Sequence, residues 1–73
     1  MEEPTRIQKD IAMFEENQQK LCEEQLDQHQ KAIVERAYQY YQDAQYYLEK
    51  KEYFTAFGCI NYAHGLLDTL LKF

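Results

Sequence analysis

The side chains best suited to chemistry in this chain are a histidine and an aspartate near its carboxyl end. His64 and Asp68 are four residues apart, so on a helix their side chains would share a face and could meet. As a metal site the pair offers two ligands, with His29 or glutamates as additions, whereas catalytic zinc takes three clustered protein ligands. The simpler interpretation places His64 at the edge of a core, bonded to Asp68 or to a tyrosine hydroxyl. We therefore expect no metal site and no cofactor.

Tyrosines could extend this pair into a binding or catalytic site. The candidate polar cluster consists of Tyr47, Tyr53, His64 and Asp68. A small helical enzyme or ligand-binding protein would need these side chains around a concave, partly polar pocket. The remaining carboxylates follow solvated helix faces, and the sequence has no glycine-rich loop for phosphate. We expect that the protein is not an enzyme. The alternative is a small helical enzyme or ligand-binding protein whose site is this cluster.

The composition argues against several partner classes. The net charge of −5 disfavours nucleic acids and anionic membrane surfaces, because both attract basic proteins. The sequence has no apolar run long enough to span a membrane and no basic-then-apolar start typical of a secretion signal. Cys22 and Cys59 are too few for a disulfide framework and too far apart for a zinc motif. These features predict a cytoplasmic protein.

Apolar residues recur at helical spacing along most of the chain, which predicts a small all-α protein. The predicted helices cover residues 5–21, 27–50 and 53–72, after an irregular N-terminus at residues 1–4. Thr5 and Gln8 have the T-x-x-Q form of a capping box, so Thr5 is the predicted N-cap of the first helix. Together the helices predict one domain over residues 1–73, an antiparallel three-helix bundle built on a C-terminal helical hairpin.

The connection between the first two helices has a second interpretation. Residues 20–30 contain no glycine or proline, and a helical register can be followed through them. One continuous helix over residues 5–50 would be about 70 Å long at about 1.5 Å per residue. Such a rod would have to bury its apolar stripe in a partner chain. We favour a break near residues 21–26, because Asp27 is a suitable cap for a new helix.

The helical hairpin within residues 44–68 is the best-specified part of the chain. The predicted inner face of its first helix comprises Ala37, Tyr40, Tyr41, Ala44, Tyr47 and Leu48. That of its second helix comprises Tyr53, Ala56, Phe57, Ile60, Ala63, His64, Leu67 and Leu71. The apolar pattern stops at residues 49–52, a charged segment long enough to reverse the chain. Ala44, Ala56 and Ala63 would allow the two helix axes to approach closely.

This hairpin carries two resemblances. Its order of small and bulky residues is similar to a single tetratricopeptide-type hairpin, although Asp68 stands where the closing proline is expected. Residues 47–50 (YLEK), 52–53 (EY), 56–57 (AF) and 62–68 (YAHGLLD) resemble the small archaeal helical family known as domain of unknown function 357. The similarity is best over residues 44–68, and the family usually has glycine where this chain has Lys51. The resemblance implies an archaeal, soluble, helical protein of a family without an assigned function.

The outer side of the last helix is unusually apolar. The candidate interaction surface consists of Gly58, Cys59, Tyr62, Gly65, Leu66, Leu70 and Phe73. A helix at the edge of a monomeric bundle normally presents charges there. Each glycine inside a helix also costs about 1 kcal/mol relative to alanine, so Gly58 and Gly65 need a reason. Either another helix approaches this side closely, or the first helix of the same chain covers it.

These patterns favour a non-enzymatic protein–protein interaction or self-association module over an enzyme. A core of this size supplies only about 3–5 kcal/mol, and small domains commonly supplement it by oligomerisation. The expected partner is therefore another protein or a second copy of the chain in a homodimer. No nucleic acid, membrane or metal partner is expected.

Overall fold

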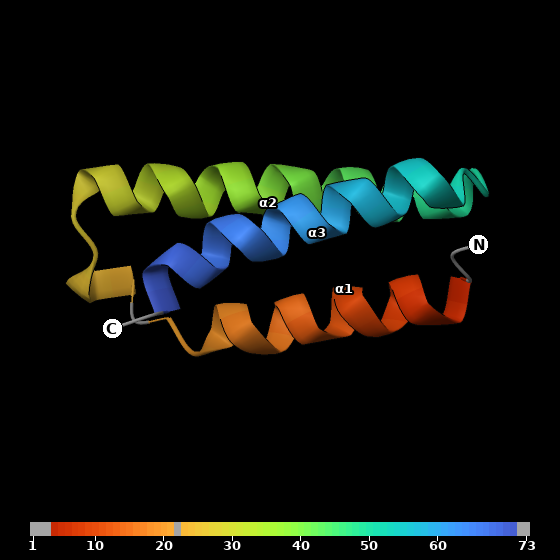
Figure 1. Cartoon of the computed structure of the whole chain (residues 1–73). Helices are drawn as coiled ribbons and strands as arrows, with labels where there is room; N and C mark the ends of the chain where they lie inside the picture. Colours follow the sequence, from red (N-terminus) through yellow and green to blue (C-terminus); the bar gives the residue numbers. More distant parts are fainter. Residues whose placement is uncertain (1–3, 22, 72–73) are drawn as a thin grey trace.

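The protein is a bundle of three helices. Its structure, a computed structural model, describes residues 4–21 and 23–71. The elements are α1 (Pro4–Gln19), a 3₁₀ turn η1 (Glu23–Gln25), α2 (Gln28–Glu49) and α3 (Tyr53–Leu71). Each helix runs antiparallel to the one before it, and α3 packs against both α2 and α1, most extensively against α2 (Figure 1). The predicted all-α three-helix bundle is confirmed.

A capped break separates α1 from α2. Asp27 is the N-cap of α2, and its carboxylate accepts a hydrogen bond of 2.8 Å from the backbone N–H of Gln30. The side-chain oxygen of Gln30 in turn accepts from the backbone N–H of Asp27 at 3.0 Å. This reciprocal capping box pairs two N–H groups that the first turn of a helix leaves without partners. The predicted break and cap are confirmed, and the long-helix alternative is wrong.

The start of α1 differs from the sequence prediction. The helix begins at Pro4, so Thr5 lies inside the first turn and is not the N-cap. Proline suits this position because its fixed φ is helical and the N–H that it lacks would have no partner in the first turn. The T-x-x-Q pattern therefore does not mark the helix end. Residues 1–3 of the predicted irregular N-terminus lie outside the described residues.

The turn between α2 and α3 is a left-handed cap on α2. Lys51 has a φ of 64°, a region that favours glycine. Its N–H donates to the carbonyl of Leu48 at 3.0 Å, and the N–H of Glu52 donates to the carbonyl of Tyr47 at 2.9 Å. These are the two hydrogen bonds of a Schellman motif, which closes a helix and pairs its last carbonyls. The turn therefore holds a lysine where its backbone suits glycine.

We expect Lys51→Gly to raise the free energy of unfolding by about 1 kcal/mol, because glycine has no Cβ to clash at this φ. Lys51→Ala is the matched control, since it removes the same charge but keeps the Cβ. Urea unfolding of the three proteins measures the difference. Equal stabilisation by glycine and alanine would mean that the lysine charge, not the backbone, is responsible.

The core forms where the three helices meet. Its buried residues are Ile7, Ile11, Phe14, Ala37, Tyr41, Ala44, Ala56, Ile60, Ala63 and Leu67. The three alanines predicted at the hairpin crossing, Ala44, Ala56 and Ala63, have no exposed surface. Phe14 of α1 is also fully buried, and its ring stacks on Tyr41 of α2 with centroids 4.9 Å apart. The predicted inner faces of the hairpin are confirmed, and α1 closes the core with one large aromatic side chain.

Candidate functional site

His64 connects α3 to α1. Its Nε2 lies 2.7 Å from the backbone carbonyl oxygen of Asp10. Because a carbonyl only accepts, this nitrogen carries the proton and donates it. The half-buried ring also packs nearly at right angles to the Phe14 ring, with centroids 5.8 Å apart and planes at 87°. The sequence interpretation expected Asp68 or a tyrosine as the partner, whereas the bond to the neighbouring helix makes His64 part of the packing between α3 and α1.

The candidate polar cluster is spread along the bundle. Tyr47 and Tyr53 lie beside the α2–α3 turn, where the half-buried Tyr47 packs edge-on against Tyr46. His64 lies eleven residues after Tyr53 (64 − 53), which is about 16 Å further along α3. Asp68 is exposed and one turn further still. The four side chains are therefore too far apart to surround one small ligand.

Tyr41 links α2 to α1 through a second polar contact. Its hydroxyl donates a hydrogen bond to the carboxylate of Glu15. Burial and the Glu15 carboxylate raise the pKa of Tyr41 from 10.0 to about 12. The phenol therefore keeps its proton at neutral pH, where it acts as a hydrogen-bond donor between helices and not as a base.

This raised pKa predicts a loss of stability in alkali. The folded state favours the protonated phenol, so the contribution of Tyr41 is complete below about pH 10 and is lost as the pH rises through about 12. We expect the free energy of unfolding to fall over this range, and to fall less steeply in Tyr41→Phe. Tyr46→Phe, which alters an exposed ring, is the control. Denaturant unfolding at several alkaline pH values measures the slopes, and parallel slopes for all three proteins would contradict the assignment.

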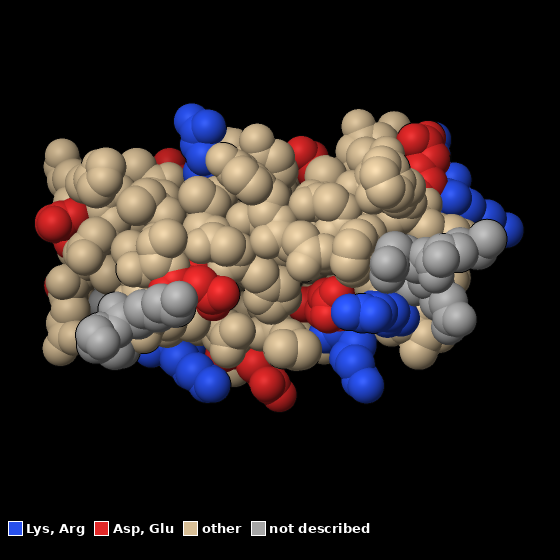
Figure 2. All heavy atoms as spheres, viewed as in Figure 1, with Lys and Arg blue, Asp and Glu red and all other residues tan. Residues whose placement is uncertain are grey.

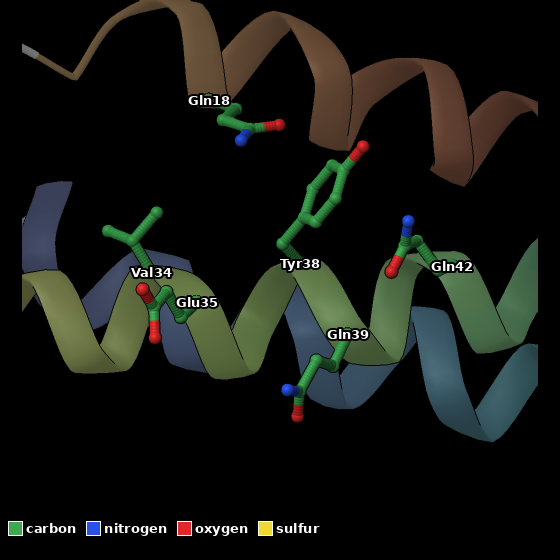
Figure 3. A pocket seen from close by; sticks show the side chains of 6 residues that line it. All are labelled: Gln18, Val34, Glu35, Tyr38, Gln39 and Gln42. Atoms are coloured by element: carbon green, nitrogen blue, oxygen red, sulfur yellow. The ribbon is translucent and has the colours of Figure 1, made fainter.

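A shallow hollow of about 400 Å³ lies between α1 and α2. It is lined by Gln18, Val34, Glu35, Tyr38, Gln39 and Gln42. Figure 3 shows Tyr38 pointing from α2 toward α1, from which Gln18 projects. The glutamine amides and the Tyr38 hydroxyl that line the hollow can form hydrogen bonds between neutral groups. The six lining residues include neither a nucleophile with an adjacent base nor a cation for an anionic ligand. Across residues 4–21 and 23–71, no buried side-chain nitrogen or oxygen is left without a hydrogen-bond partner.

Metal ligands and thiols are sparse in the described residues. No three side chains of His, Cys, Asp or Glu come close enough together in this part of the chain to hold a metal ion. Burial, and then the nearby Asp43 carboxylate, raise the pKa of the half-buried Cys59 thiol. The thiol is therefore protonated at neutral pH and weakly nucleophilic. Cys22 lies outside the described residues. None of the described helices is both long enough and apolar enough to cross a membrane.

The candidate interaction surface divides into a covered and an uncovered part. Cys59 and Leu66 are half-buried and pack against the core, and Leu70 is half-buried as well. Tyr62 meets Tyr40 of α2 edge-on at 4.6 Å between centroids, yet it remains 52% exposed. The cover near Tyr62 therefore comes from α2, not from the first helix as the sequence interpretation had considered. Phe73 lies outside the described residues.

The uncovered residues of that surface belong to a wider ridge along α3, which includes exposed residues outside the predicted surface and which we call the α3 face. It consists of Phe54, Gly58, Asn61, Tyr62 and Gly65, all of which are exposed. Phe54 is 87% exposed and begins the ridge at the turn end of α3. Figure 2 shows an uncharged band along the middle of this side of the molecule, with acidic and basic side chains above and below it. The α3 face is thus a continuous uncharged surface with a large aromatic ring at one end.

The polar side chains on or beside the α3 face bond to their own helix. The Asn61 side-chain amide donates to the carbonyl of Phe57 at 2.8 Å, and the Thr69 hydroxyl donates to the carbonyl of Leu66 at 2.7 Å. A Cβ added at Gly58 or at Gly65 would meet nothing within 4 Å. The packing of the single chain therefore requires neither glycine, although each weakens the helix.

Two members of the α3 face lie outside the predicted interaction surface, Asn61 and the much larger Phe54. Phe54 lies four residues before Gly58, so helical spacing alone puts both residues on one side of the helix. The predicted inner face includes Tyr53, and the predicted outer surface begins only at Gly58, one turn after Phe54. The helical spacing in the sequence is therefore sufficient to place Phe54 on the outer side of the last helix.

Comparison with known proteins gives one family match. The family model described as "Protein of unknown function (DUF357)" matches residues 9–73. The match includes most of α1 and all the described residues of α2 and α3, and so extends well beyond the hairpin that carries the sequence resemblance. No curated protein matches the chain.

Proposed function

We propose that this chain, which belongs to the DUF357 family, is a non-enzymatic protein–protein interaction module that binds through the α3 face. The single observation that carries the proposal is Phe54, a large aromatic side chain left 87% exposed on an uncharged helix face. Contiguous uncharged surface that holds large apolar side chains is typical of interaction sites. A phenylalanine there would gain most from burial by a partner.

The glycines and the internally bonded polar side chains support this proposal. Gly58 and Gly65 leave the α3 backbone uncovered, so another helix could approach it closely. Burying a polar group is costly unless the group is hydrogen-bonded, and the Asn61 amide already has a partner in its own helix. One N–H of that amide would therefore stay bonded when a partner displaces water from the middle of the α3 face, while its second N–H and its Oδ1 could bond to the partner.

The test compares Phe54→Glu with Met13→Glu by co-purification from the native host. Both variants place an acid at an exposed apolar position, but Met13 lies on α1, outside the α3 face. Glutamate suits position 54 because it follows the first residue of α3, near the positive end of the helix dipole. Circular dichroism should show that both variants are folded.

We expect proteins that co-purify with the parent, including further copies of the chain, to be retained by Met13→Glu and lost from Phe54→Glu. The proposal fails if the parent and both variants carry the same associated proteins, or if none of them carries any. It also fails if both variants lose the same proteins, because the loss would then follow from added charge alone.

A further inference from the structure

We infer that the α2–α3 hairpin has a helix-binding groove that α1 fills within the same chain, and that an amphipathic helix of another protein can replace α1 there. This α1 groove is lined by residues that contact α1 or the hollow beside it: Val34, Tyr38, Tyr41, Phe57 and His64. None of them belongs to the α3 face, so the inference does not rest on the proposed function. It stands on the anchors of α1, on the bonds that the groove makes to α1, and on an anchor position that α1 leaves unfilled.

α1 packs on the hairpin through three apolar anchors. Its buried residues are Ile7, Ile11 and Phe14, which are spaced as i, i+4 and i+7. Amphipathic helices that bind a hydrophobic groove of another protein use this spacing. α2 and α3 pack most extensively on each other. α1 is joined to them by residues 20–27, of which the described ones form no α-helix. α1 thus lies on the hairpin as a tethered helical ligand would.

The α1 groove also donates two hydrogen bonds to α1. His64 Nε2 donates to the backbone carbonyl of Asp10 at 2.7 Å, and the Tyr41 hydroxyl donates to the carboxylate of Glu15. Every helix offers backbone carbonyls, so the histidine contact places few demands on the sequence of the helix that it meets. The tyrosine contact is more selective, because it suits a helix with a carboxylate directly after its third anchor.

Gln18 occupies a fourth anchor position with a polar side chain. It follows Phe14 by four residues, at i+11, and therefore lies on the same face of α1 as the three anchors. The side chain is half-buried and lines the hollow of about 400 Å³ together with Val34 and Tyr38 of α2 (Figure 3). The Tyr38 ring remains 41% exposed. A helix with an apolar side chain at this position would cover the ring and fill part of the hollow, which α1 does not.

This unfilled position makes α1 a replaceable occupant of its own groove. A short tether holds a segment at an effective concentration of about millimolar, so a helix from another protein must fit the groove better than α1 does. Partial burial of a leucine side chain in the hollow would strengthen binding about tenfold. The partner inferred here is therefore an amphipathic helix with apolar residues at i, i+4, i+7 and i+11, and with an acid at i+8.

The experiment measures the binding of labelled peptides to the full-length chain by fluorescence anisotropy. The probes are synthetic peptides of residues 4–21 with the natural sequence, with Gln18→Leu or with Phe14→Ala. We expect the Gln18→Leu peptide to bind the parent chain about tenfold more tightly than the natural peptide does. The Phe14→Ala peptide, which lacks the largest anchor, should show no binding.

The same substitution within the full-length chain is the matched control. There, Gln18→Leu improves the fit of the tethered α1, so the chain should bind the Gln18→Leu peptide about tenfold more weakly than the parent does. Urea unfolding should show that this variant is more stable than the parent. Phe54→Glu alters the α3 face alone and should bind the peptide as the parent does.

Each contrary result has a separate meaning. If the parent binds none of the peptides at millimolar concentration, α1 is not replaceable and the inference fails. If Gln18→Leu in the chain leaves peptide binding unchanged, the peptide binds outside the α1 groove and the inference fails as well. A less stable Gln18→Leu chain would show that the hollow does not accept an apolar side chain, which overturns the fourth position. Loss of peptide binding in Phe54→Glu would assign the peptide to the α3 face, which contradicts this inference but supports the proposed function.

Discussion

Phe14→Ala is expected to destabilise the protein by about 3–5 kcal/mol, the range for truncating a buried phenylalanine. The side chain has no exposed surface, stacks on Tyr41 and packs nearly at right angles to the His64 ring. It thus contacts both α2 and α3 from α1, and its loss would leave a cavity where all three helices meet. Since a core of this size supplies about 3–5 kcal/mol in total, we expect the variant to be largely unfolded at 25 °C.

Phe14→Leu is the matched control, because it keeps an apolar side chain of similar volume and should cost less than about 1.5 kcal/mol. Thermal melts followed by circular dichroism at 222 nm compare the parent with both variants. If Phe14→Ala melts at the same temperature as Phe14→Leu, then α1 does not dock on the hairpin through this residue, and the position of α1 in Figure 1 would be wrong.

The hairpin and its core could be predicted from the sequence because they depend on local periodicity. Alanines at helical spacing fixed which sides of α2 and α3 face each other, and the structure buries them completely. The start of α2 could be predicted as well, because Asp27 and Gln30 form their capping box within one turn. These features depend on residues that are neighbours along the chain or along one helix face.

The contacts of the candidate site depend on how whole helices are rotated and docked, which local patterns do not encode. The acceptor for His64 is the backbone carbonyl of Asp10, 54 positions away, and every residue offers the same carbonyl acceptor. Likewise, a small rotation of α3 about its axis decides whether Tyr62 meets α2 or α1. The outer apolar stripe of α3 could thus be predicted from the sequence, but its division into covered residues and the α3 face could not.

The left-handed turn could be predicted only in part from the sequence. The charged residues predicted a reversal, and the resemblance pointed to glycine where Lys51 stands. The φ of 64° explains why glycine would suit that position, because the two Schellman hydrogen bonds can close only with this residue in the left-handed region. Lys51 therefore adopts a backbone conformation that is unfavourable for lysine.

Replacing both Gly58 and Gly65 by alanine should raise the free energy of unfolding of the dilute monomer by about 2 kcal/mol. Each substitution contributes about 1 kcal/mol of helix propensity. Neither new methyl group would meet another atom of the chain within 4 Å, so no clash offsets the gain. The two sites are seven residues apart, about 10 Å along α3, so their effects should add. Urea unfolding at the lowest workable concentration measures the gain.

The same double variant should bind a partner less well than the parent, because its methyl groups would lie where the proposed function brings another helix close to α3. Co-purification of the double variant and the parent from the native host tests this. A drop in monomer stability would mean that the glycines already pack within one chain. Increased stability with unchanged association would place the contact elsewhere. Increased stability with weakened association is the result expected if these glycines weaken the folded chain to leave room for a second helix.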